Sequence, residues 1–312
     1  MELNKIYNED CQEGMKRIPD KSVDMILCDL PYGTIKGALH YGDKVDWDVV
    51  INTKELFEQF KRVLKPRGRA VLTAQEPFTT ELKEQSDSQL PFNYRMVWVK
   101  ESSGNPLFAK KAPLKYYEDI LVFTKELDIN YKKELREYFR GLHNYINKTK
   151  TEIFNLMGNS KSDHTFRYNS LQFDLCTEET YLELTDLFGL KQYEFYKEYS
   201  ELKELDEKIT PIYNVLNGKS NKDVFHIAKD DKSFHPTQKP VELFEKLIEI
   251  YSNSDDVVLD VCMGSGTTAI ACINTNRNYI GFELDETYYK KSLERIKNHA
   301  TQNELFDVLE DN

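Results

Sequence analysis

Short apolar runs alternate along much of the chain with longer segments whose apolar residues recur at helical spacing. The runs are typical of buried strands and the longer segments of amphipathic helices. Strands are predicted at 4–10, 23–29, 69–75, 94–100, 119–125, 256–262 and 278–284, and helices at 11–18, 53–64, 240–251, 267–274 and 287–299. Because strands and helices alternate and the strand centres are apolar, the pattern predicts an α/β fold with a mostly parallel sheet covered on both faces.

Residues 126–222 lose this alternation and are helical in pattern, with many Tyr, Lys and Glu residues. The sequence therefore predicts three segments: residues 1–125 and 223–312 as the two halves of one α/β domain, and 126–222 as a helical insert. Within the insert, residues 159–188 have the spacing of two short helices around a turn. That spacing suits a helix-turn-helix that reads DNA and equally suits a plain packing module.

Composition limits the class of protein. The chain has 312 residues, of which 40% are hydrophobic and 30% charged, as in a globular protein with a sizeable core. No apolar run reaches the roughly 20 residues of a membrane span, and the N-terminus lacks the layout of a signal peptide. The five cysteines form no C-x-x-C pair and the histidines have no metal-ligand spacing. We expect a cytoplasmic protein with reduced thiols, no membrane segment and no metal.

The net charge of −11 argues against tight non-specific binding to nucleic acid, but the charge is unevenly spread. Residues 131–170 contain eight Lys and Arg against four Asp and Glu, and residues 91–125 contain six against three. A local face that binds a polyanion therefore remains compatible with the acidic chain.

A glycine-rich loop, "LDVCMGSGTTAIA", lies between a predicted strand and a predicted helix. Gly264 and Gly266 allow a ligand to approach the backbone closely, and Glu283 ends the next strand, where a carboxylate can accept both hydroxyls of a ribose. The spacing G-x-G-x-x-A also fits a nicotinamide dinucleotide, and a tight turn without any ligand is the third interpretation. Cys262 is expected to be a small buried apolar residue rather than a nucleophile.

The stretch "CDLPYG", residues 28–33, ends another apolar strand abruptly. Pro31 cannot donate a ladder hydrogen bond, so strand pairing is expected to stop there. The Asp29 carboxylate, the Leu30 carbonyl and the Tyr32 ring are then left at the strand tip. An ordinary turn at the end of a strand is the competing interpretation.

Several predicted strands end in acids: Asp10, Asp29, Asp260 and Glu283. In an open sheet, ligands bind outside the carboxyl ends of the strands, so these four carboxylates are expected to face one crevice.

Motifs at both ends of the chain resemble those of one family, the amino-group DNA methyltransferases. "DLPYG" resembles their D-P-P-Y signature, "DVCMGSGTT" resembles their S-adenosylmethionine loop, and "HPTQKPVELFEKLI" (235–248) is similar to the segment before that loop in the permuted, β-type group. The resemblance extends over roughly 1–125 and 223–297. It implies a Rossmann-like methyltransferase fold with a mostly parallel, doubly wound sheet, one antiparallel strand and a target-recognition region in the insert. It also implies S-adenosyl-L-methionine (SAM) as cofactor and double-stranded DNA as partner.

This sequence departs from the family pattern at two places. Leu30 replaces the first proline of D-P-P-Y but still supplies a backbone carbonyl. Val261 and Cys262 replace the Pro-Phe often found before the glycines, which leaves open how the adenine or the methionine portion of the cofactor is packed.

By the same resemblance, the catalytic residues are Asp29, Leu30, Pro31 and Tyr32, with Asp29 and the Leu30 carbonyl accepting the hydrogens of an exocyclic amino group. Tyr32 is expected to stack on a base turned out of the duplex. Glu283 is expected to hold the ribose and Asp10 the adenine amino group. Asp260, residues 264–266, Thr237 and Lys239 are expected near the methionine portion. The cofactor residues are Asp10, Thr237, Lys239, Asp260, Cys262, Gly264, Ser265, Gly266, Thr267 and Glu283.

Residues 102–119 mix lysines with aromatic residues between two predicted strands, and are the first candidates for phosphate contact. The predicted DNA contacts, here and in the insert, are Lys100, Asn105, Lys110, Lys111, Lys115, Arg140 and Arg167.

The expected target is adenine N6. Attack through carbon 5 of cytosine needs a cysteine in a Pro-Cys pair, and none of the ten prolines precedes a cysteine. Asp29 stands where the cytosine-N4 enzymes more often have Ser. Four alternatives stay open: a cytosine-N4 enzyme, a nicotinamide-dependent oxidoreductase, a DNA-binding protein without activity, and a methyltransferase of RNA or of protein glutamine. A companion restriction endonuclease and a homodimer are both compatible with the resemblance. All methyltransferase interpretations require Tyr32 and Gly264 to share one cavity.

Overall fold

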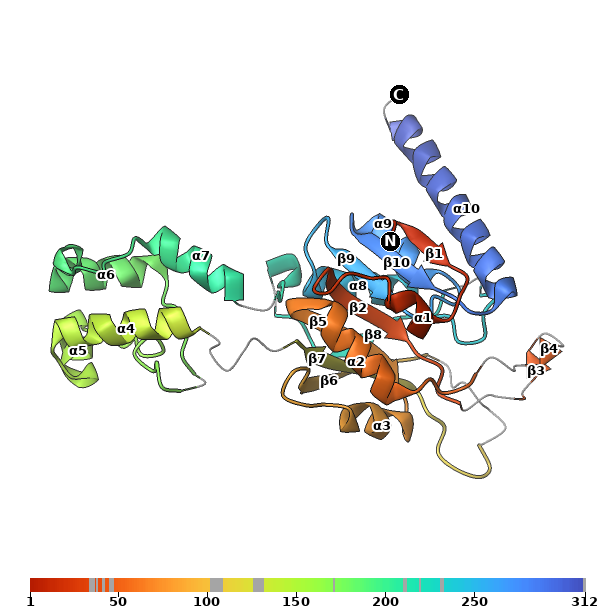
Figure 1. Ribbon diagram of the computed structural model, residues 1–312, viewed down its shortest axis with the longest axis horizontal. Helices are drawn as coiled ribbons and strands as arrows, with labels where there is room; N and C mark the ends of the chain where they lie inside the picture. Colours follow the sequence, from red (N-terminus) through yellow and green to blue (C-terminus); the bar gives the residue numbers. More distant parts are fainter. Residues whose placement is uncertain are drawn as a thin grey trace. The chain divides into compact units, whose positions relative to one another are not determined.

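The computed structural model describes residues 1–33, 37, 39–40, 43–44, 48–101, 109–125, 132–170, 172–209, 212–218, 220–230 and 233–310. The chain divides into two compact units. Met1–Glu126 and Pro211–Asn312 together form one, here called the sheet unit, and Leu127–Thr210 forms the other, the helical unit (Figure 1).

The helical unit ends before the boundary at residue 222 that the sequence predicts. Asn214 explains the difference, because its side-chain amide donates to the carbonyl oxygens of Glu249 and Ser252 at 2.8 and 2.9 Å. These bonds fasten residues 212–218 to the sheet unit.

The sheet unit contains ten strands and six α-helices within its described residues. In chain order these are β1 (Lys5–Tyr7), α1 (Cys11–Met15), β2 (Val23–Asp29), β3 (Leu39–His40), β4 (Asp43–Lys44), α2 (Thr53–Val63), β5 (Leu64–Ala74), α3 (Phe78–Glu84), β6 (Phe92–Val99), β7 (Tyr117–Thr124), a 3₁₀ turn (Leu216–Gly218), β8 (Val224–His226), α8 (Val241–Tyr251), β9 (Val257–Asp260), α9 (Thr267–Asn274), β10 (Asn278–Phe282) and α10 (Glu286–Glu310).

Eight of the strands form one sheet in the order β1-β10-β9-β2-β5-β7-β6-β8. β7 runs antiparallel to both of its neighbours, and every other pair in this sheet is parallel. This confirms the prediction of a mostly parallel sheet with one antiparallel strand. β2 and β9, which carry the two motifs, are neighbours although more than 200 residues separate them.

Alternate residues of β2 point to opposite faces of the sheet, as a strand's two-residue period requires. Ile26 and Cys28 pack with α1, α2 and α3 in one core cluster, while Met25 and Leu27 pack with α8 and α9 in another. Helices therefore cover both faces (Figure 1). Burial on both sides explains why the strand reads as an almost continuous apolar run.

The helical unit has a core of its own. Its helices are α4 (Lys133–Ile146), α5 (Lys150–Met157), α6 (Glu178–Phe188), a 3₁₀ turn (Leu190–Gln192) and α7 (Tyr199–Ile209). Phe139 of α4 and Tyr181 of α6 are fully buried and lie at the centre of the cluster.

Two sequence expectations differ from the structure. Residues 159–188 hold one helix, α6, preceded by a series of turns, so the predicted pair of helices is wrong. Ser, Asp and Asn side chains bond to nearby backbone in that stretch, which competes with helix formation. β1 ends at Tyr7, and Asp10 caps α1 instead of ending the strand. Among the described residues, no helix is long and apolar enough to span a membrane.

Candidate functional site

A cavity of about 730 Å³ opens at the carboxyl ends of β10, β9 and β2, a size typical of small-molecule sites. Tyr32 from the first part of the chain and Gly264 from the last part both line it, so the requirement that they share one cavity is met. The predicted catalytic and cofactor residues that line the cavity are Asp10, Asp29, Leu30, Pro31, Tyr32, Thr237, Lys239, Asp260, Cys262, Gly264, Ser265, Thr267 and Glu283.

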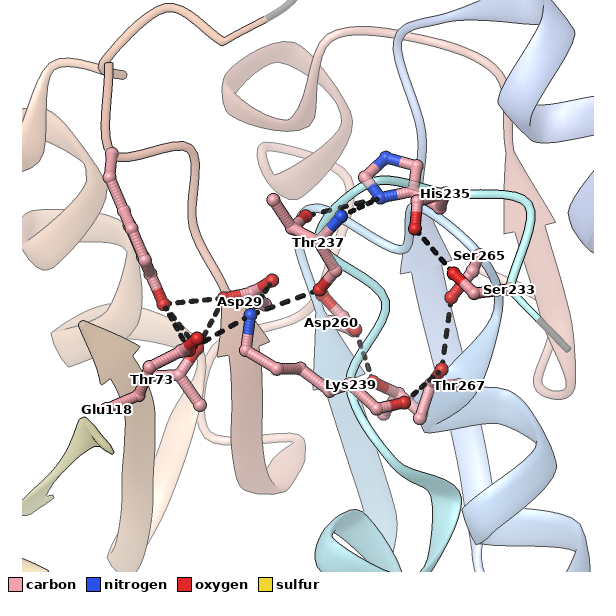
Figure 2. A network of polar contacts seen from close by, with 12 residues as sticks. Asp29, Thr73, Glu118, Ser233, His235, Thr237, Lys239, Asp260, Ser265 and Thr267 are labelled. Atoms are coloured by element: carbon pink, nitrogen blue, oxygen red, sulfur yellow. Dashed lines mark hydrogen bonds and ion pairs between the residues drawn. The ribbon is translucent and has the colours of Figure 1, made fainter. Parts of the chain in front are cut away.

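Asp29, the last residue of β2, is held by three donors. Its Oδ1 accepts from the Tyr32 hydroxyl at 2.8 Å and from the Thr73 hydroxyl at 2.5 Å. Its Oδ2 accepts from the Lys239 ammonium at 2.5 Å. Figure 2 shows Thr73 and Lys239 pointing toward the Asp29 carboxylate. The side chain therefore has a fixed orientation before any substrate arrives.

Lys239 is a buried lysine that lines the cavity and pairs with Asp29, a contact that its predicted place beside the methionine portion of the cofactor did not include. Its side chain is 4% exposed, and its ammonium also lies 3.3 Å from Glu118 Oε2. Glu118 in turn pairs through Oε1 with Lys100 at 2.9 Å. The ion pairs therefore form one charged chain of four side chains, two acidic and two basic, in the order Asp29, Lys239, Glu118 and Lys100.

The charged forms of Glu118 and Lys239 are stabilised by the ion pairs around them. Burial by itself raises the pKa of Glu118, but the ammonium groups of Lys239 and Lys100 outweigh it and hold the pKa at about 2. Burial lowers the pKa of Lys239, and the carboxylates of Asp29 and Glu118 more than offset this, so the net shift is upward. Lys239 therefore remains an ammonium group in the neutral range.

The Tyr32 ring is fixed at the mouth of this network. Its hydroxyl also reaches Thr73 at 3.1 Å and Glu118 at 3.4 Å, and its ring lies 5.7 Å from that of Phe78. Burial first, and then the nearby carboxylates, raise the pKa of Tyr32 well above its usual value, so the phenol stays protonated and donates. Beside it, Leu30 has a buried side chain that packs in the core below the cavity.

The glycine loop is fastened to Glu283. Gly264 has φ +51°, in the left-handed region that favours glycine, and its N–H donates to Glu283 Oε2 at 2.7 Å. The other oxygen accepts from the Asp285 N–H at 2.8 Å. Burial, partly offset by these bonds, raises the pKa of Glu283. The carboxylate keeps further lone pairs for a ligand's hydroxyl groups.

Gly266 has a different role from the one predicted, because it does not line the cavity. It precedes α9 with φ +79°, and a Cβ there would meet Ser292 and Ile296 of α10 at 3.2 Å. Glycine is needed for the turn and for the packing of α10.

Asp260, at the end of β9, faces the cavity but binds the loop. Its carboxylate accepts from the Cys262 N–H at 2.9 Å and from the Thr268 hydroxyl. Burial, only partly offset by these bonds, raises the pKa of Asp260 to about 7. Its chemistry fits an anchor for the glycine loop better than a direct ligand of the cofactor.

Asp10 also uses its carboxylate locally. Oδ1 accepts from the backbone N–H groups of Gln12 and Glu13 and caps α1, while the residue still borders the cavity.

Several side chains of the site were missed from the sequence. Arg295 of α10 donates to the Ser265 carbonyl and the Thr267 hydroxyl and pairs with Asp230. His235 packs edge-on against Tyr288 at 4.3 Å, and both line the cavity. Figure 2 shows His235 bonded to Thr237. Tyr288 and Arg295 are single residues on α10, and such residues give no sequence signal of these contacts. His235 opens the "HPTQKP" segment, so for it a signal was available.

Glu118 was also missed, although the sequence does contain a signal that it is buried and paired. It stands next to an acid at the start of the apolar run of β7, and an acid on a buried strand needs a partner.

The predicted DNA contacts fall into four groups. Lys100 is buried on Glu118, where a phosphate cannot reach it, so its predicted role is wrong. Arg167 is paired with Asp163 and Gln172, which neutralises much of its charge. Asn105 lies outside the described residues. The exposed members are Lys110, Lys111 and Lys115 of the sheet unit and Arg140 of the helical unit.

Comparison with known proteins decides the family. The family model of DNA methylases that modify N6 or N4 amino groups matches residues 23–294. The chain belongs to this family. It is 25% identical over 318 residues to the DNA adenine methyltransferase YhdJ of Escherichia coli, covering 98% of this chain and 88% of that protein.

Solved structures show the same fold. The M1.HpyAVI–SAM complex superposes with a TM-score of 0.56 at 19% identity, covering 93% of this chain and 98% of that one. The cytosine-N4-specific PvuII DNA methyltransferase superposes with a TM-score of 0.54 at 13% identity, covering 96% and 91%.

The protein is therefore a SAM-dependent amino-group DNA methyltransferase, and the nicotinamide alternative is set aside. The residues present fit SAM, since the cavity lies beside a glycine loop with positive φ and is lined by the Glu283 carboxylate, which has lone pairs left for hydroxyl groups. His235 and Tyr288 provide aromatic surface at the cavity wall, although Cys262 offers none.

Proposed function

We propose that this protein methylates the N6 amino group of adenine in DNA. The observation that carries the proposal is the position of the Asp29 carboxylate. It lies beside the Leu30 backbone, at the tip of β2, in the same cavity as the glycine loop.

The residues act mainly by orientation. The lone pair of an exocyclic amino nitrogen is delocalised into the ring, which makes the nitrogen a poor nucleophile. Asp29 and the Leu30 carbonyl are placed to accept its two hydrogens and so favour a tetrahedral nitrogen with a free lone pair. When bound, SAM supplies an electrophilic methyl group on its sulfonium.

Tyr32 holds the target base. Unstacking a base costs a few kcal/mol, and stacking on an aromatic ring returns about 1–3 kcal/mol. The hydroxyl bonds of Tyr32 and its contact with Phe78 keep the ring plane fixed, so little side-chain entropy is lost on binding.

Two facts favour adenine over cytosine. Asp occupies position 29, where the cytosine-N4 enzymes more often have Ser, and the Escherichia coli relative is named an adenine methyltransferase. The likeness to the PvuII enzyme supports the fold alone and leaves cytosine-N4 as the competing product.

DNA contact is assigned to exposed cations on both units. Lys110, Lys111 and Lys115 are placed on the loop between β6 and β7 for phosphate contact, and the helical unit is assigned the reading of sequence. Arg140 is the exposed candidate there, since it lies over the Tyr168 ring at 5.4 Å and donates to Asn169. A companion endonuclease and a homodimer remain part of the hypothesis.

Mass spectrometry of nucleosides tests the choice of base. DNA treated with the protein and SAM is digested and analysed for N6-methyladenine and N4-methylcytosine. N6-methyladenine is expected. N4-methylcytosine as the only product would overturn the proposal without affecting the family.

A further inference from the structure

Glu118 and Lys100 have no contact with the cavity, yet they end the charged chain that begins at Asp29. Neither residue is among those that line the cavity, and both side chains are buried. Burying charges is costly unless they are paired, and a buried ion pair is weak evidence for a gain in stability. Their placement behind a catalytic carboxylate calls for another explanation.

The geometry divides one ammonium between two acids. Lys239 Nζ lies 2.5 Å from Asp29 Oδ2 and 3.3 Å from Glu118 Oε2. Glu118 is itself held from the other side by Lys100, which follows β6 and whose ammonium also lies 5.8 Å from the centre of the Trp98 ring. The charge on Glu118 that is free to attract Lys239 therefore depends on Lys100.

We propose that Glu118 and Lys100 are positioning residues for methyl transfer, which act through Lys239 to set how much positive charge rests on Asp29. A shared ammonium orients the Asp29 carboxylate and leaves it able to accept an amino hydrogen. The inference rests on the family's reaction but not on the identity of the methylated base, since methylated adenine and cytosine count equally in its test.

Removing Glu118 and removing Lys100 are expected to have opposite effects on how strongly the Lys239 ammonium pairs with Asp29. Without the charge of Glu118, Asp29 is left as the carboxylate partner of Lys239, so the ammonium is held more closely to Asp29. Without Lys100, Glu118 attracts Lys239 more strongly and draws the ammonium away from Asp29. Among the described residues, Tyr32 and Asp260 also interact with Asp29, and Lys229 lies near Lys100, Glu118 and Lys239.

The test measures single-turnover methyl transfer to DNA against pH for Glu118→Gln and Lys100→Met, with SAM affinity measured by calorimetry. We expect each variant to lose about 10- to 100-fold in rate, as small displacements of reacting groups do, with SAM affinity nearly unchanged. The acidic limb of the profile is expected to move down in pH for Glu118→Gln and up for Lys100→Met, each by about 1 unit.

Lys61→Met is the matched control. Lys61 is a buried lysine of the same unit, paired with Glu58 and Asp87, and does not line the cavity. Its loss is expected to lower the unfolding temperature and leave the acidic limb in place.

Charge-conserving variants keep the test decisive if a neutral variant does not fold. Lys100→Arg and Glu118→Asp are expected to retain the native acidic limb. Three results would overturn the inference. The acidic limbs of Glu118→Gln and Lys100→Met could shift in the same direction, or both variants could keep the native rate. The third is a shift of the acidic limb in Lys100→Arg or Glu118→Asp. A product that is methylcytosine alone would overturn the adenine proposal and leave this inference standing.

Discussion

Lys239 in the sheet unit and Lys132 in the helical unit are alike in burial and in partners. Each is 4% exposed and each is shared between two carboxylates. Lys132 lies 2.7 Å from both Asp174 and Asp206. A buried, shared lysine is therefore not by itself a sign of catalysis.

The difference lies in where the carboxylates point. Asp174 is 67% exposed to solvent, whereas Asp29 is 18% exposed and lines the cavity. Lys132 fastens the start of α4 to its neighbours, and Lys239 pairs with a carboxylate that lines the cavity. Exposure alone does not separate the two cases, because Asp206 is 20% exposed. What separates them is that Asp29 lines the cavity and neither Asp174 nor Asp206 does.

Removing the acids should give the largest contrast. Asp29→Ala removes an acceptor of the amino group and is expected to lower the single-turnover rate at least about 10²-fold, the usual effect of losing one preorganised polar contact. Asp206→Ala is expected to lower the unfolding temperature only. Undiminished methyl transfer by Asp29→Ala, assayed with radiolabelled SAM, would refute the role of this carboxylate.

Removing the lysines should give a smaller contrast in rate. Lys239→Met leaves Asp29 and Glu118 buried with one cation fewer, so we expect a loss of about 10- to 100-fold in rate. The free energy of unfolding should also fall by about 3–5 kcal/mol, as for other broken buried pairs. Lys132→Met should lose less stability and keep its rate. Chemical denaturation and single-turnover assays check both, and equal losses of rate would remove the distinction.

Removing a buried tyrosine hydroxyl from each unit should lower the rate of methyl transfer in the sheet unit only. Tyr32→Phe keeps the stacking ring but removes the bonds to Asp29 and Thr73, and is expected to lower the rate by about 10-fold, equivalent to the net worth of a charged hydrogen bond. Tyr181→Phe removes a hydroxyl bonded to Tyr138 and to the Lys197 carbonyl. Its rate should be native, and a similar loss there would indicate a general effect of stability.

Removing exposed lysines should change affinity and leave the chemistry intact. The triple change of Lys110, Lys111 and Lys115 to Gln is expected to weaken DNA binding several-fold and to reduce the slope of log K against log salt by about 2–3. The single-turnover rate at saturating DNA should not change. An unchanged slope in fluorescence anisotropy titrations would exclude these lysines as phosphate contacts.

The smallest expected effect is on the pH dependence of stability. Because the pKa of Asp260 is raised from 3.8 to about 7, its contribution to stability is complete below pH 4 and is lost as the pH rises through 7. Asp260→Asn should therefore lose less stability than the native protein between pH 4 and pH 7. Parallel profiles of unfolding temperature against pH would contradict this.

The sequence predicted best what is encoded locally. The apolar runs of β2 and β9 end in acids, and parallel strands place such ends at one edge, so the shared cavity followed from pattern alone. The pairing of Lys239 with Asp29 joins residues 210 positions apart and depends on side-chain rotamers, which no local pattern encodes.

The helical unit was predicted less well for a related reason. Its apolar periodicity marks helices such as α4 and α6, but Ser160 to Ser170 carry mixed polar residues whose side chains bond to the backbone. There the turn chemistry prevailed over a weak helical period.

A crystal structure with SAM bound tests the central claim most directly, that one cavity serves both the methyl donor and the amino group. We predict the ribose hydroxyls on Glu283 and the methyl group directed across the cavity toward Asp29 and Tyr32. SAM bound elsewhere, or with its methyl group facing away from the tip of β2, would contradict the account.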